Sequence, residues 1–483
     1  MPKLYSAAIS GPIPLRFKLI HGFGAVAFGV KDIGFQFFLL FYYSQVMGMD
    51  ASLVSLALLC ALLIDAVIDP ILGNLSDRTY TRWGRRLPWL YAAPVPLAFA
   101  WVMLWSSPVG SVPTFWELLG IAVVVRVLLS CCEVPSASLI PEITADYDER
   151  TTLFRFRYIE GWLGGILMLT LSYTVFLAGE NGQLNADGYR DFAMVGGILM
   201  VISVAGSALG QHRVLARVPE TKPEPFTLKA CFGEIIEAFR ERAFLIFGAG
   251  ALTAYVNQGI SFSLTPYVTA YVWRLDSVLI PGLPENITAL SLYPVILAIS
   301  AFAMFFVVGP MHAKFGKPVS AAIGAIGTAI FTLLPYMTLY FGLWPALDTL
   351  VSAGLLYALL LVGNTLSIVT LISASSMLAE IVEAYFEETG RRSEGAFYSG
   401  NWLIQKCATG LGIFLTGQFL SAIQFATDAK PGEIPDSVIG NLVLFFALGT
   451  VALLANSAYW LWRFPITREQ HEARVQRLSK GTT

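Results

Sequence analysis

The chain is poor in charged residues, histidine and cysteine. Only 13% of its 483 residues are Asp, Glu, Lys or Arg, whereas soluble domains carry about 25%. Hydrophobic residues make up 56% of the chain, and the mean hydropathy is +0.65. This balance excludes an ordinary soluble protein and predicts a polytopic membrane protein.

The few reactive side chains are also scattered. The five cysteines form no CxxC or Cys/His cluster, and the four histidines are dispersed. Such spacing argues against a metal site or a disulfide framework. No nucleophile motif, phosphate-binding loop or dinucleotide fingerprint is present, so the sequence predicts neither an enzyme nor a bound cofactor.

Long apolar runs divide the chain. A run of about 20 residues is long enough to cross a bilayer as a helix. We therefore predict an all-α polytopic protein with about twelve transmembrane helices. The predicted spans are 17–45, 52–74, 87–106, 115–140, 153–178, 191–212, 243–272, 288–311, 318–341, 346–376, 397–424 and 438–462.

Two carboxylates interrupt the second of these runs. Asp65 and Asp69 lie within ALLCALLIDAVIDPILG, where the flanking residues are apolar. A carboxylate in the middle of a membrane helix costs about 2.5–3.5 kcal/mol on insertion scales, and positions four residues apart share one helix face. We interpret the pair as a cation site in a transporter. The alternative is a structural ion pair with a basic residue of another helix.

Lys and Arg are distributed unevenly between alternate loops. The N-terminus, the even-numbered loops and the C-terminal tail hold 25 of the 31 basic residues, and the odd-numbered loops hold only Arg190, Arg274 and Lys430. Cytoplasmic loops carry the excess of positive charge in membrane proteins. The distribution predicts an even number of spans, with both termini in the cytoplasm, in a plasma membrane or bacterial inner membrane.

The longest polar interruption lies in the middle of the chain. Residues 213–242 begin with a Pro-rich stretch and end in an amphipathic one, which predicts a central cytoplasmic loop with an interfacial helix. The loop separates an N-terminal six-helix half with the cation site (1–212) from a C-terminal six-helix half (243–463). A cytoplasmic tail follows (464–483). This plan of two six-helix halves resembles the major facilitator fold.

The segment after the second span resembles the loop 2–3 motif of major facilitators. It runs GNLSDRTYTRWGRR. In such a motif Gly73 allows close helix approach, and Asp77 pairs with arginines to hold a cytoplasmic gate closed until the halves move. Its basic residues include Arg78, Arg85 and Arg86. A purely topogenic basic loop explains the arginines but not the glycine and the aspartate at that spacing.

A larger set of segments resembles the glycoside–pentoside–hexuronide cation symporters, the family typified by melibiose permease. The set covers most of the chain, and no single piece would suffice. The segments are residues 64–90, 21–49, 133–141, 150–157 and 379–400, together with Lys406. The resemblance implies a major facilitator fold and cation-coupled transport of a sugar.

The same resemblance assigns roles to individual residues. Three positions correspond to the family's cation site: Asp65, Asp69 and Ser130. Three others correspond to its sugar site: Asp32, Glu133 and Arg157. Lys406 stands where the family has a lysine between the cation and the sugar.

The sequence departs from the family pattern at three positions. Ile68 replaces an amide found in the sodium-coupled sugar members, and its side chain offers no oxygen to Na⁺. Two close carboxylates can hold a proton instead, so the coupling cation is H⁺ or Na⁺. Glu133 replaces an aspartate, and Ala137 replaces a tryptophan that stacks on the sugar. Trp402 or Trp162 can supply the missing aromatic surface.

The charged residues inside the spans nearly balance. The acids are Asp32, Asp65, Asp69, Glu133 and Glu160. The bases are Lys31, Arg126, Arg157 and Lys406. The excess of one negative charge suits one bound monovalent cation. Lys31 and Asp32 point about 100° apart on a helix, so we expect one of them to face the site. For Arg126 and Glu160, a structural ion pair and a functional role are both open.

We therefore expect a monomeric, cation-coupled symporter of a sugar or glycoside that works by alternating access within the lipid bilayer. The first alternative is a carrier of amphipathic, lysolipid-type or carboxylated solutes on the same fold, which the apolar Ile68 and the missing tryptophan suit. The second is a non-transporting membrane sensor or enzyme. No nucleic acid is expected as a partner.

Overall fold

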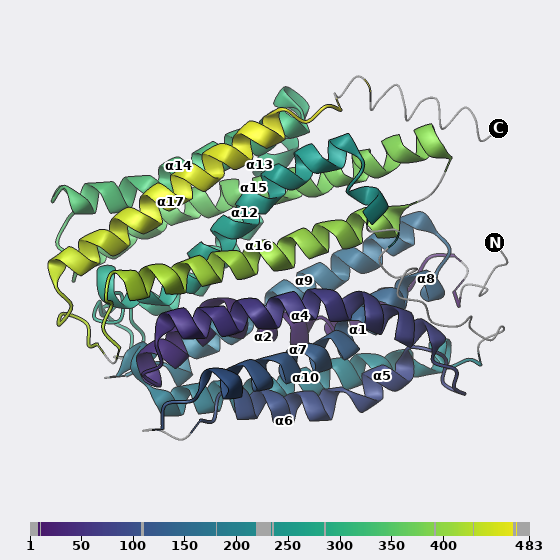
Figure 1. The fold of residues 1–483 in the computed structure, drawn as a ribbon, viewed down its shortest axis with the longest axis horizontal. Coiled ribbons are helices and arrows are strands. Elements are labelled where there is room, and N and C mark those ends of the chain that lie inside the picture. Colours follow the sequence, from purple (N-terminus) through teal and green to yellow (C-terminus); the bar gives the residue numbers. More distant parts are fainter. Residues whose placement is uncertain are drawn as a thin grey trace. The chain divides into compact units, whose positions relative to one another are not determined.

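The structure, a computed structural model, is mostly helical in the residues that it describes (Figure 1). The Cα positions form two compact units, the N-terminal unit (residues 1–231) and the C-terminal unit (residues 232–483). Most of the predicted central loop and interfacial helix, and most of the predicted tail, lie outside the described residues. The structure describes residues 8–9, 11–107, 111–179, 181–218, 233, 236–284, 286–390, 393–427, 429–466 and 470.

Each of the twelve predicted spans is helical over most of its length. Ten helical segments in the described ranges are long and apolar enough to cross a membrane. The third predicted span consists of two shorter helices, α5 (Leu87–Ala92) and α6 (Pro94–Leu104). The eleventh is α16 (Glu394–Ala422), whose 29 residues include the polar Gln405 and Lys406. Polar residues of this kind lower the hydropathy of a span without preventing the helix.

The N-terminal unit contains the first six spans, which run roughly parallel in Figure 1. The first span comprises α1 (Leu15–Phe23), α2 (Val26–Asp32), α3 (Leu39–Phe41) and π-helical turns at Ile33–Phe38 and Tyr42–Val46. The remaining elements are α4 (Ala51–Arg78), α5, α6, α7 (Phe115–Ser138), α8 (Ile140–Ile143), α9 (Tyr147–Leu171) with a π-helical turn at Ser172–Phe176, and α10 (Ala186–Leu215).

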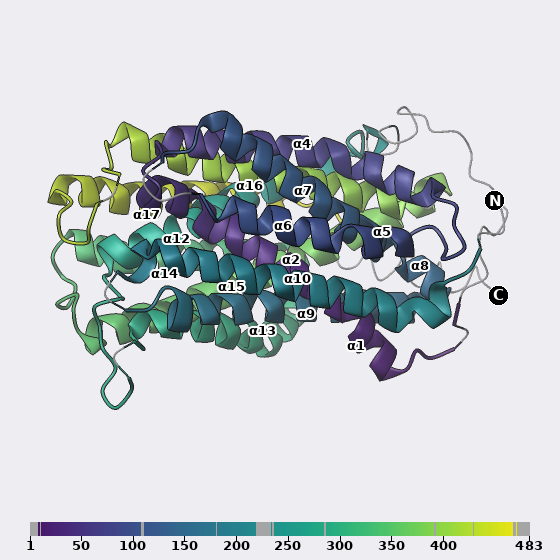
Figure 2. The same cartoon turned by 90° about the horizontal axis from the view of Figure 1, so that it is seen from below.

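Two helix pairs of this unit position the residues of interest. Helix α4 packs along α7, as Figure 2 shows, and α2 packs along α9. The second contact is very close: a Cβ at Gly29 would lie 1.9 Å from the Gly161 carbonyl oxygen. Small residues allow such approach between membrane helices. By contrast, a Cβ at Gly73 would lie 3.4 Å from Val134 Cγ1, an ordinary contact.

Helix ends in this unit follow ordinary capping chemistry. Asp50 begins α4 by accepting the backbone N–H groups of Ser52 and Leu53. Thr114 and Glu117 form a capping box at the start of α7, in which each side chain accepts the other's backbone N–H. These caps fix where α4 and α7 begin.

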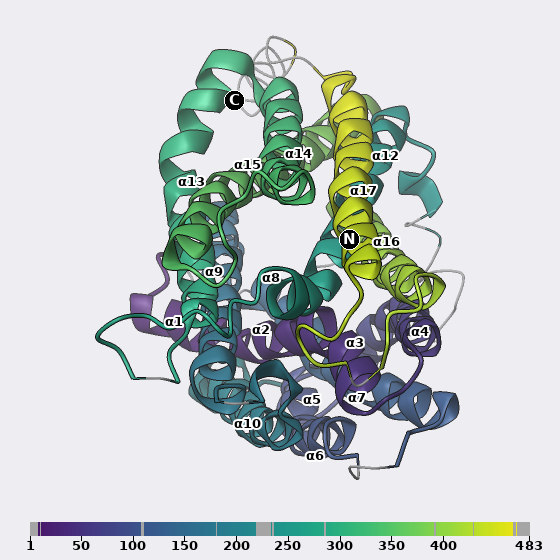
Figure 3. The same ribbon diagram turned by 90° about the vertical axis from the view of Figure 1, so that its left-hand side faces the viewer.

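The C-terminal unit contains the last six spans, whose helices α12 to α17 are labelled in Figure 3. The elements of this unit are α12 (Arg242–Tyr267) with a π-helical turn at Val268–Val272, α13 (Tyr293–Phe315), α14 (Lys317–Tyr340), α15 (Leu350–Thr389), α16 and α17 (Asp436–Trp462). Helix α14 packs against both α15 and α17, and α12 packs against α16 and α17. Gly316, with φ of +77°, makes the one-residue turn between α13 and α14.

Candidate functional site

The two carboxylates of α4 meet one hydroxyl of α7. Ser130 Oγ lies 2.8 Å from Asp65 Oδ1 and 2.6 Å from Asp69 Oδ1. Asp65 and Ser130 are both buried. A serine hydroxyl has a single hydrogen, so it donates to only one of these oxygens at a time. The second short contact therefore requires another hydrogen or a metal ion.

Arg126, one turn before Ser130 on α7, is the basic partner of Asp65. Arg126 Nη1 lies 3.3 Å from Asp65 Oδ2, and the two side chains are 9% and 5% exposed. The Arg126 guanidinium also lies over the Phe35 ring, 4.2 Å from its centroid. The structural ion pair considered from the sequence therefore exists, but it engages only one of the two carboxylates. The sequence alone could not identify this partner.

A second charged cluster joins the first span to α7. Lys31 Nζ lies 3.0 Å from Asp32 Oδ1 and 3.6 Å from Glu133 Oε2. Gln36 Nε2 donates to the same Asp32 oxygen. Lys31 and Asp32 thus belong to one cluster, because the long lysine side chain spans the angle that separates adjacent positions of a helix. Asp32 and Glu133 keep 50% and 40% of their side-chain surface exposed, so both can accept a further donor.

Arg157 of α9 is buried without a carboxylate partner. Its Nη1 donates to Ser136 Oγ of α7 at 2.5 Å, and its guanidinium lies 5.6 Å from the centroid of the Phe28 ring. No carboxylate among the described residues lies within ion-pairing distance of it. A buried guanidinium has five N–H donors, so Arg157 has donors available for a ligand. Glu160, one turn further along, packs its Oε1 against Gly22 and finds no hydrogen-bond partner in the described residues.

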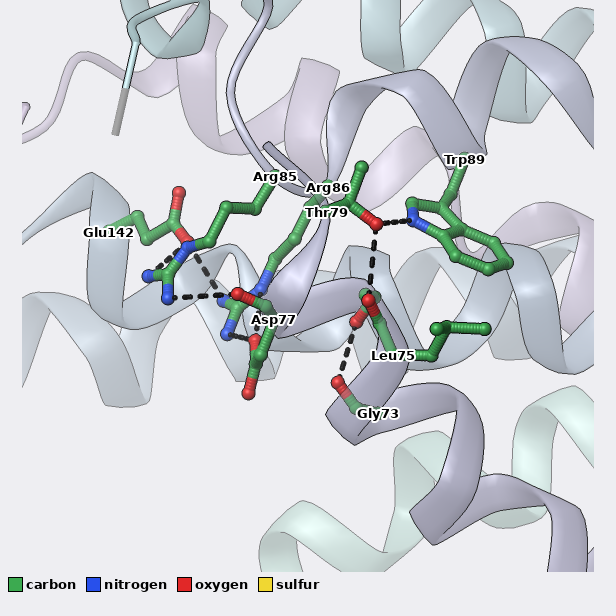
Figure 4. Close-up of polar contacts among 9 residues, drawn as sticks. Gly73, Leu75, Asp77, Thr79, Arg85, Arg86, Trp89 and Glu142 are labelled. Atoms are coloured by element: carbon green, nitrogen blue, oxygen red, sulfur yellow. Dashed lines mark hydrogen bonds and ion pairs between the residues drawn. The ribbon is translucent and has the colours of Figure 1, made fainter. Parts of the chain in front are cut away.

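Ion pairs and hydrogen bonds of a charged cluster hold the loop between α4 and α5, as Figure 4 shows. Asp77 Oδ1 accepts from Arg86 Nη2 at 2.5 Å and from Arg86 Nε at 3.1 Å. Glu142 Oε1 lies 3.2 Å from Arg85 Nη2 and 3.4 Å from Arg86 Nη1. Arg78, the third predicted gating arginine, donates to Asn74 on its own helix. All of these contacts lie within the N-terminal unit.

Glu142 is a residue that the sequence reasoning missed. It lies on the four-residue helix α8, and its side chain is only 14% exposed because both arginines cover it. Its backbone carbonyl also accepts the Ala8 N–H at 3.0 Å, and the neighbouring Ile143 carbonyl accepts the Ile9 N–H at 2.9 Å. The described part of the N-terminal segment is thereby attached beside the charged cluster.

The remaining predicted residues lie on α16 in the C-terminal unit. Trp402 and Lys406 are one turn apart, and Trp402 is 43% exposed. Trp162, the other aromatic candidate, lies on α9 of the N-terminal unit and is 45% exposed. In the described part of the chain, no group of three or more His, Cys, Asp or Glu is arranged to hold a metal ion.

Asp65, Arg126 and Arg157 are buried in this bundle of apolar helices, an arrangement that is typical of membrane transporters. Residues 20–468 match the family described as MFS/sugar transport protein. The chain belongs to that family, and it is therefore a multi-pass membrane transporter of the major facilitator class.

Known proteins similar to this chain extend over most of its length. An uncharacterized symporter of Synechocystis sp. is 28% identical, with 95% of this chain and 96% of the relative covered. The isoprimeverose transporter of Lactiplantibacillus pentosus is 26% identical, with 86% and 83% covered. The crystal structure of a D-xylose-proton symporter is 16% identical in sequence and has a TM-score of 0.63. The match covers 94% of this chain and 98% of that protein. That last likeness shows the major facilitator fold.

Proposed function

We propose that this protein carries a sugar or glycoside together with one monovalent cation, by alternating access. The family description and the names of relatives, a symporter and an isoprimeverose transporter, support this kind of cargo. The observation that carries the proposal is the cluster of Asp65, Ser130 and Asp69. Carboxylates inside apolar helices are costly and are retained where they bind an ion or a substrate.

One cation satisfies this cluster. Arg126 pairs with Asp65 in this cluster, and we propose that the cation binds at Asp69. A second hydrogen or a metal ion also completes the two short contacts of Ser130. We favour a proton, because Ile68 contributes no oxygen where the sodium-coupled members have an amide, and a Na⁺ ion requires oxygen ligands.

The solute site of the proposal uses the second charged cluster. A sugar has hydroxyl groups that donate to carboxylates and accept from guanidinium or ammonium groups. Asp32 and Glu133 provide exposed acceptors, and Arg157 provides unpaired donors. Lys406 and Trp402 of α16 are proposed to bind the solute as well, Trp402 as an apolar surface for a sugar ring.

Coupling follows from α7, which carries residues of both clusters. Ser130 of the cation cluster and Glu133 of the solute cluster are three residues apart on one helix face. A cation that holds Ser130 in place therefore also orients Glu133. By linkage, whatever factor the cation adds to solute affinity, the solute adds to cation affinity.

The charged cluster of the α4–α5 loop includes Asp77, Arg85 and Arg86, whose role in a cytoplasmic gate stays a prediction. Its contacts join Asp77, Arg85, Arg86 and Glu142 within one unit. A rigid-body movement of that unit leaves them intact. We propose that they keep the loop attached to α8 throughout the cycle. Both termini are proposed to be cytoplasmic, as the 25-to-3 distribution of basic residues indicates, and the transporter is proposed to be a monomer.

Thermal unfolding of the purified protein tests the proposal. The panel contains glycosides, hexuronates and lysolipids, each in sodium and in choline at equal ionic strength and at several pH values. A ligand that binds only the folded state raises stability by mass action. We expect stabilisation by a glycoside that depends on pH more than on sodium, and we expect Asp69→Asn to lose this pH dependence. Stabilisation by amphiphiles alone would contradict the sugar assignment.

A further inference from the structure

A cavity in the C-terminal unit contains charged residues to which the proposed function gives no role. It opens where α12 and α14 end and α17 begins, and its volume is about 320 Å³, within the range of roughly 300–1,000 Å³ that ligand pockets occupy. Its lining includes apolar side chains such as Leu339 and Val443. Arg274, Tyr340 and Asp436 are its principal polar side chains.

Arg274 is held in an unusual backbone conformation beside this cavity. Its φ is +49°, in the left-handed region that residues other than glycine seldom adopt. Such strained positions cluster at ligand sites. Its Nε is buried without a hydrogen-bond partner in the described residues, and its Nη1 forms a long, exposed ion pair with Asp348 at 4.0 Å. The guanidinium therefore has donors available to a ligand.

Asp436 supplies the opposite charge in the first turn of α17. It is exposed and forms no hydrogen bond or ion pair with any residue that the structure describes. In particular, Asp436 and Arg274 both line the cavity but do not pair with each other. The cavity thus presents a separated cation and anion, an arrangement that is complementary to a ligand carrying both charges.

Large apolar side chains adjoin the charged residues. Phe341 directly follows the lining residue Tyr340 and is 69% exposed, and Leu343 is 77% exposed. Tyr340 itself is 49% exposed. Tyrosines at helix ends are typical of the level of the lipid headgroups. A ligand in this cavity therefore has exposed apolar surface next to its charged part.

We propose that the cavity binds the headgroup of phosphatidylethanolamine. Arg274 binds the phosphate, because a guanidinium fork matches phosphate oxygens in a bidentate manner. Asp436 accepts from the ammonium group, and the acyl chains follow Phe341 and Leu343 into the bilayer. The site is separate from the residues proposed to bind the cation and the solute.

Native mass spectrometry of the purified full-length protein tests this proposal. The protein is titrated with phosphatidylethanolamine, phosphatidylglycerol and phosphatidylcholine of the same acyl chains, and with soluble glycerophosphoethanolamine. The variants are Arg274→Asn, which tolerates the left-handed backbone, and Asp436→Asn. Arg190→Asn, an exposed arginine at the start of α10, is the matched control. Thermal unfolding in lipid-free detergent establishes that each variant is folded.

We expect wild type and Arg190→Asn to bind phosphatidylethanolamine more tightly than the other lipids. Arg274→Asn should weaken both phosphatidylethanolamine and phosphatidylglycerol by about tenfold or more, since it removes hydrogen bonds to a charged group. Asp436→Asn should weaken phosphatidylethanolamine alone and abolish the preference. Unchanged binding in both variants would overturn the site. Equal binding of glycerophosphoethanolamine would overturn its assignment to a lipid. Lipid binding needs no transported solute, so neither result bears on the proposed transport.

Discussion

Replacing Arg126 with glutamine removes the guanidinium that pairs with Asp65. The two side chains are 9% and 5% exposed, and their atoms approach to 3.3 Å. Removing one partner of a buried ion pair costs about 3–5 kcal/mol, because the other charge stays buried and unpaired. Ser130 still contacts Asp65, so we expect the lower end, about 3 kcal/mol, for Arg126→Gln. Asp65→Asn leaves the arginine unpaired and should cost a similar amount.

The double variant separates an ion pair from two independent residues. Asp65→Asn with Arg126→Gln removes both charges and nearly preserves side-chain volume. We expect it to be more stable than the sum of the single losses predicts, by about 1–3 kcal/mol of interaction energy. The assay is thermal unfolding of all four proteins in one detergent, with the exposed Arg190→Gln as a control that should match wild type.

The same proteins also distinguish a structural role from a functional one. Arg126→Gln removes a positive charge beside Asp65, so added cation should stabilise this variant more than wild type. The double variant should recover stability but lose cation-driven accumulation of solute in proteoliposomes, because Asp65 is missing. Additive losses in the unfolding assay, with no extra stabilisation by cation, would refute the reasoning.

Three further predictions concern the other clusters. Ser130→Ala should shift the cation concentration at which solute binding is half-maximal by about tenfold or more. Ser203→Ala, whose hydroxyl donates to the Met200 carbonyl of its own helix, should not. Glu142→Gln should lower the unfolding temperature, since two nearly buried arginines lose a carboxylate; equal unfolding temperatures would show that Asp77 alone holds them. Arg157→Lys should reduce solute affinity by about tenfold, measured by titrating thermal stabilisation, while cation-induced stabilisation stays at the wild-type value.

Features that depend on the local sequence were predictable. The twelve spans follow from run length, because a membrane helix must bury about 20 consecutive residues. Only the boundaries and the break between α5 and α6 at Pro94 needed the structure. The contact of Ser130 with Asp65 and Asp69 depends on packing of α4 against α7. The role of Ser130 is predicted by the resemblance to a family and not by the spacing of these residues.

Features that depend on tertiary packing were not predictable in the same way. Glu142 lies more than 50 residues from the arginines that it joins, and nothing in its own neighbourhood marks it as their partner. Arg126 was recognised as an intramembrane base, but its pairing with Asp65 rather than Asp69 is set by the register between two helices. The strained Arg274 and its cavity also had no counterpart in the sequence beyond the rarity of basic residues in odd-numbered loops.

The most direct test is solute accumulation in proteoliposomes that contain either wild type or Asp69→Asn. A pH gradient and a sodium gradient are imposed separately, and exchange of labelled solute at equilibrium is measured in parallel. We expect wild type to accumulate a glycoside under the pH gradient, and Asp69→Asn to lose accumulation while retaining exchange, because the solute site remains. Accumulation by Asp69→Asn with the ion dependence of wild type would contradict the assignment of the cation site.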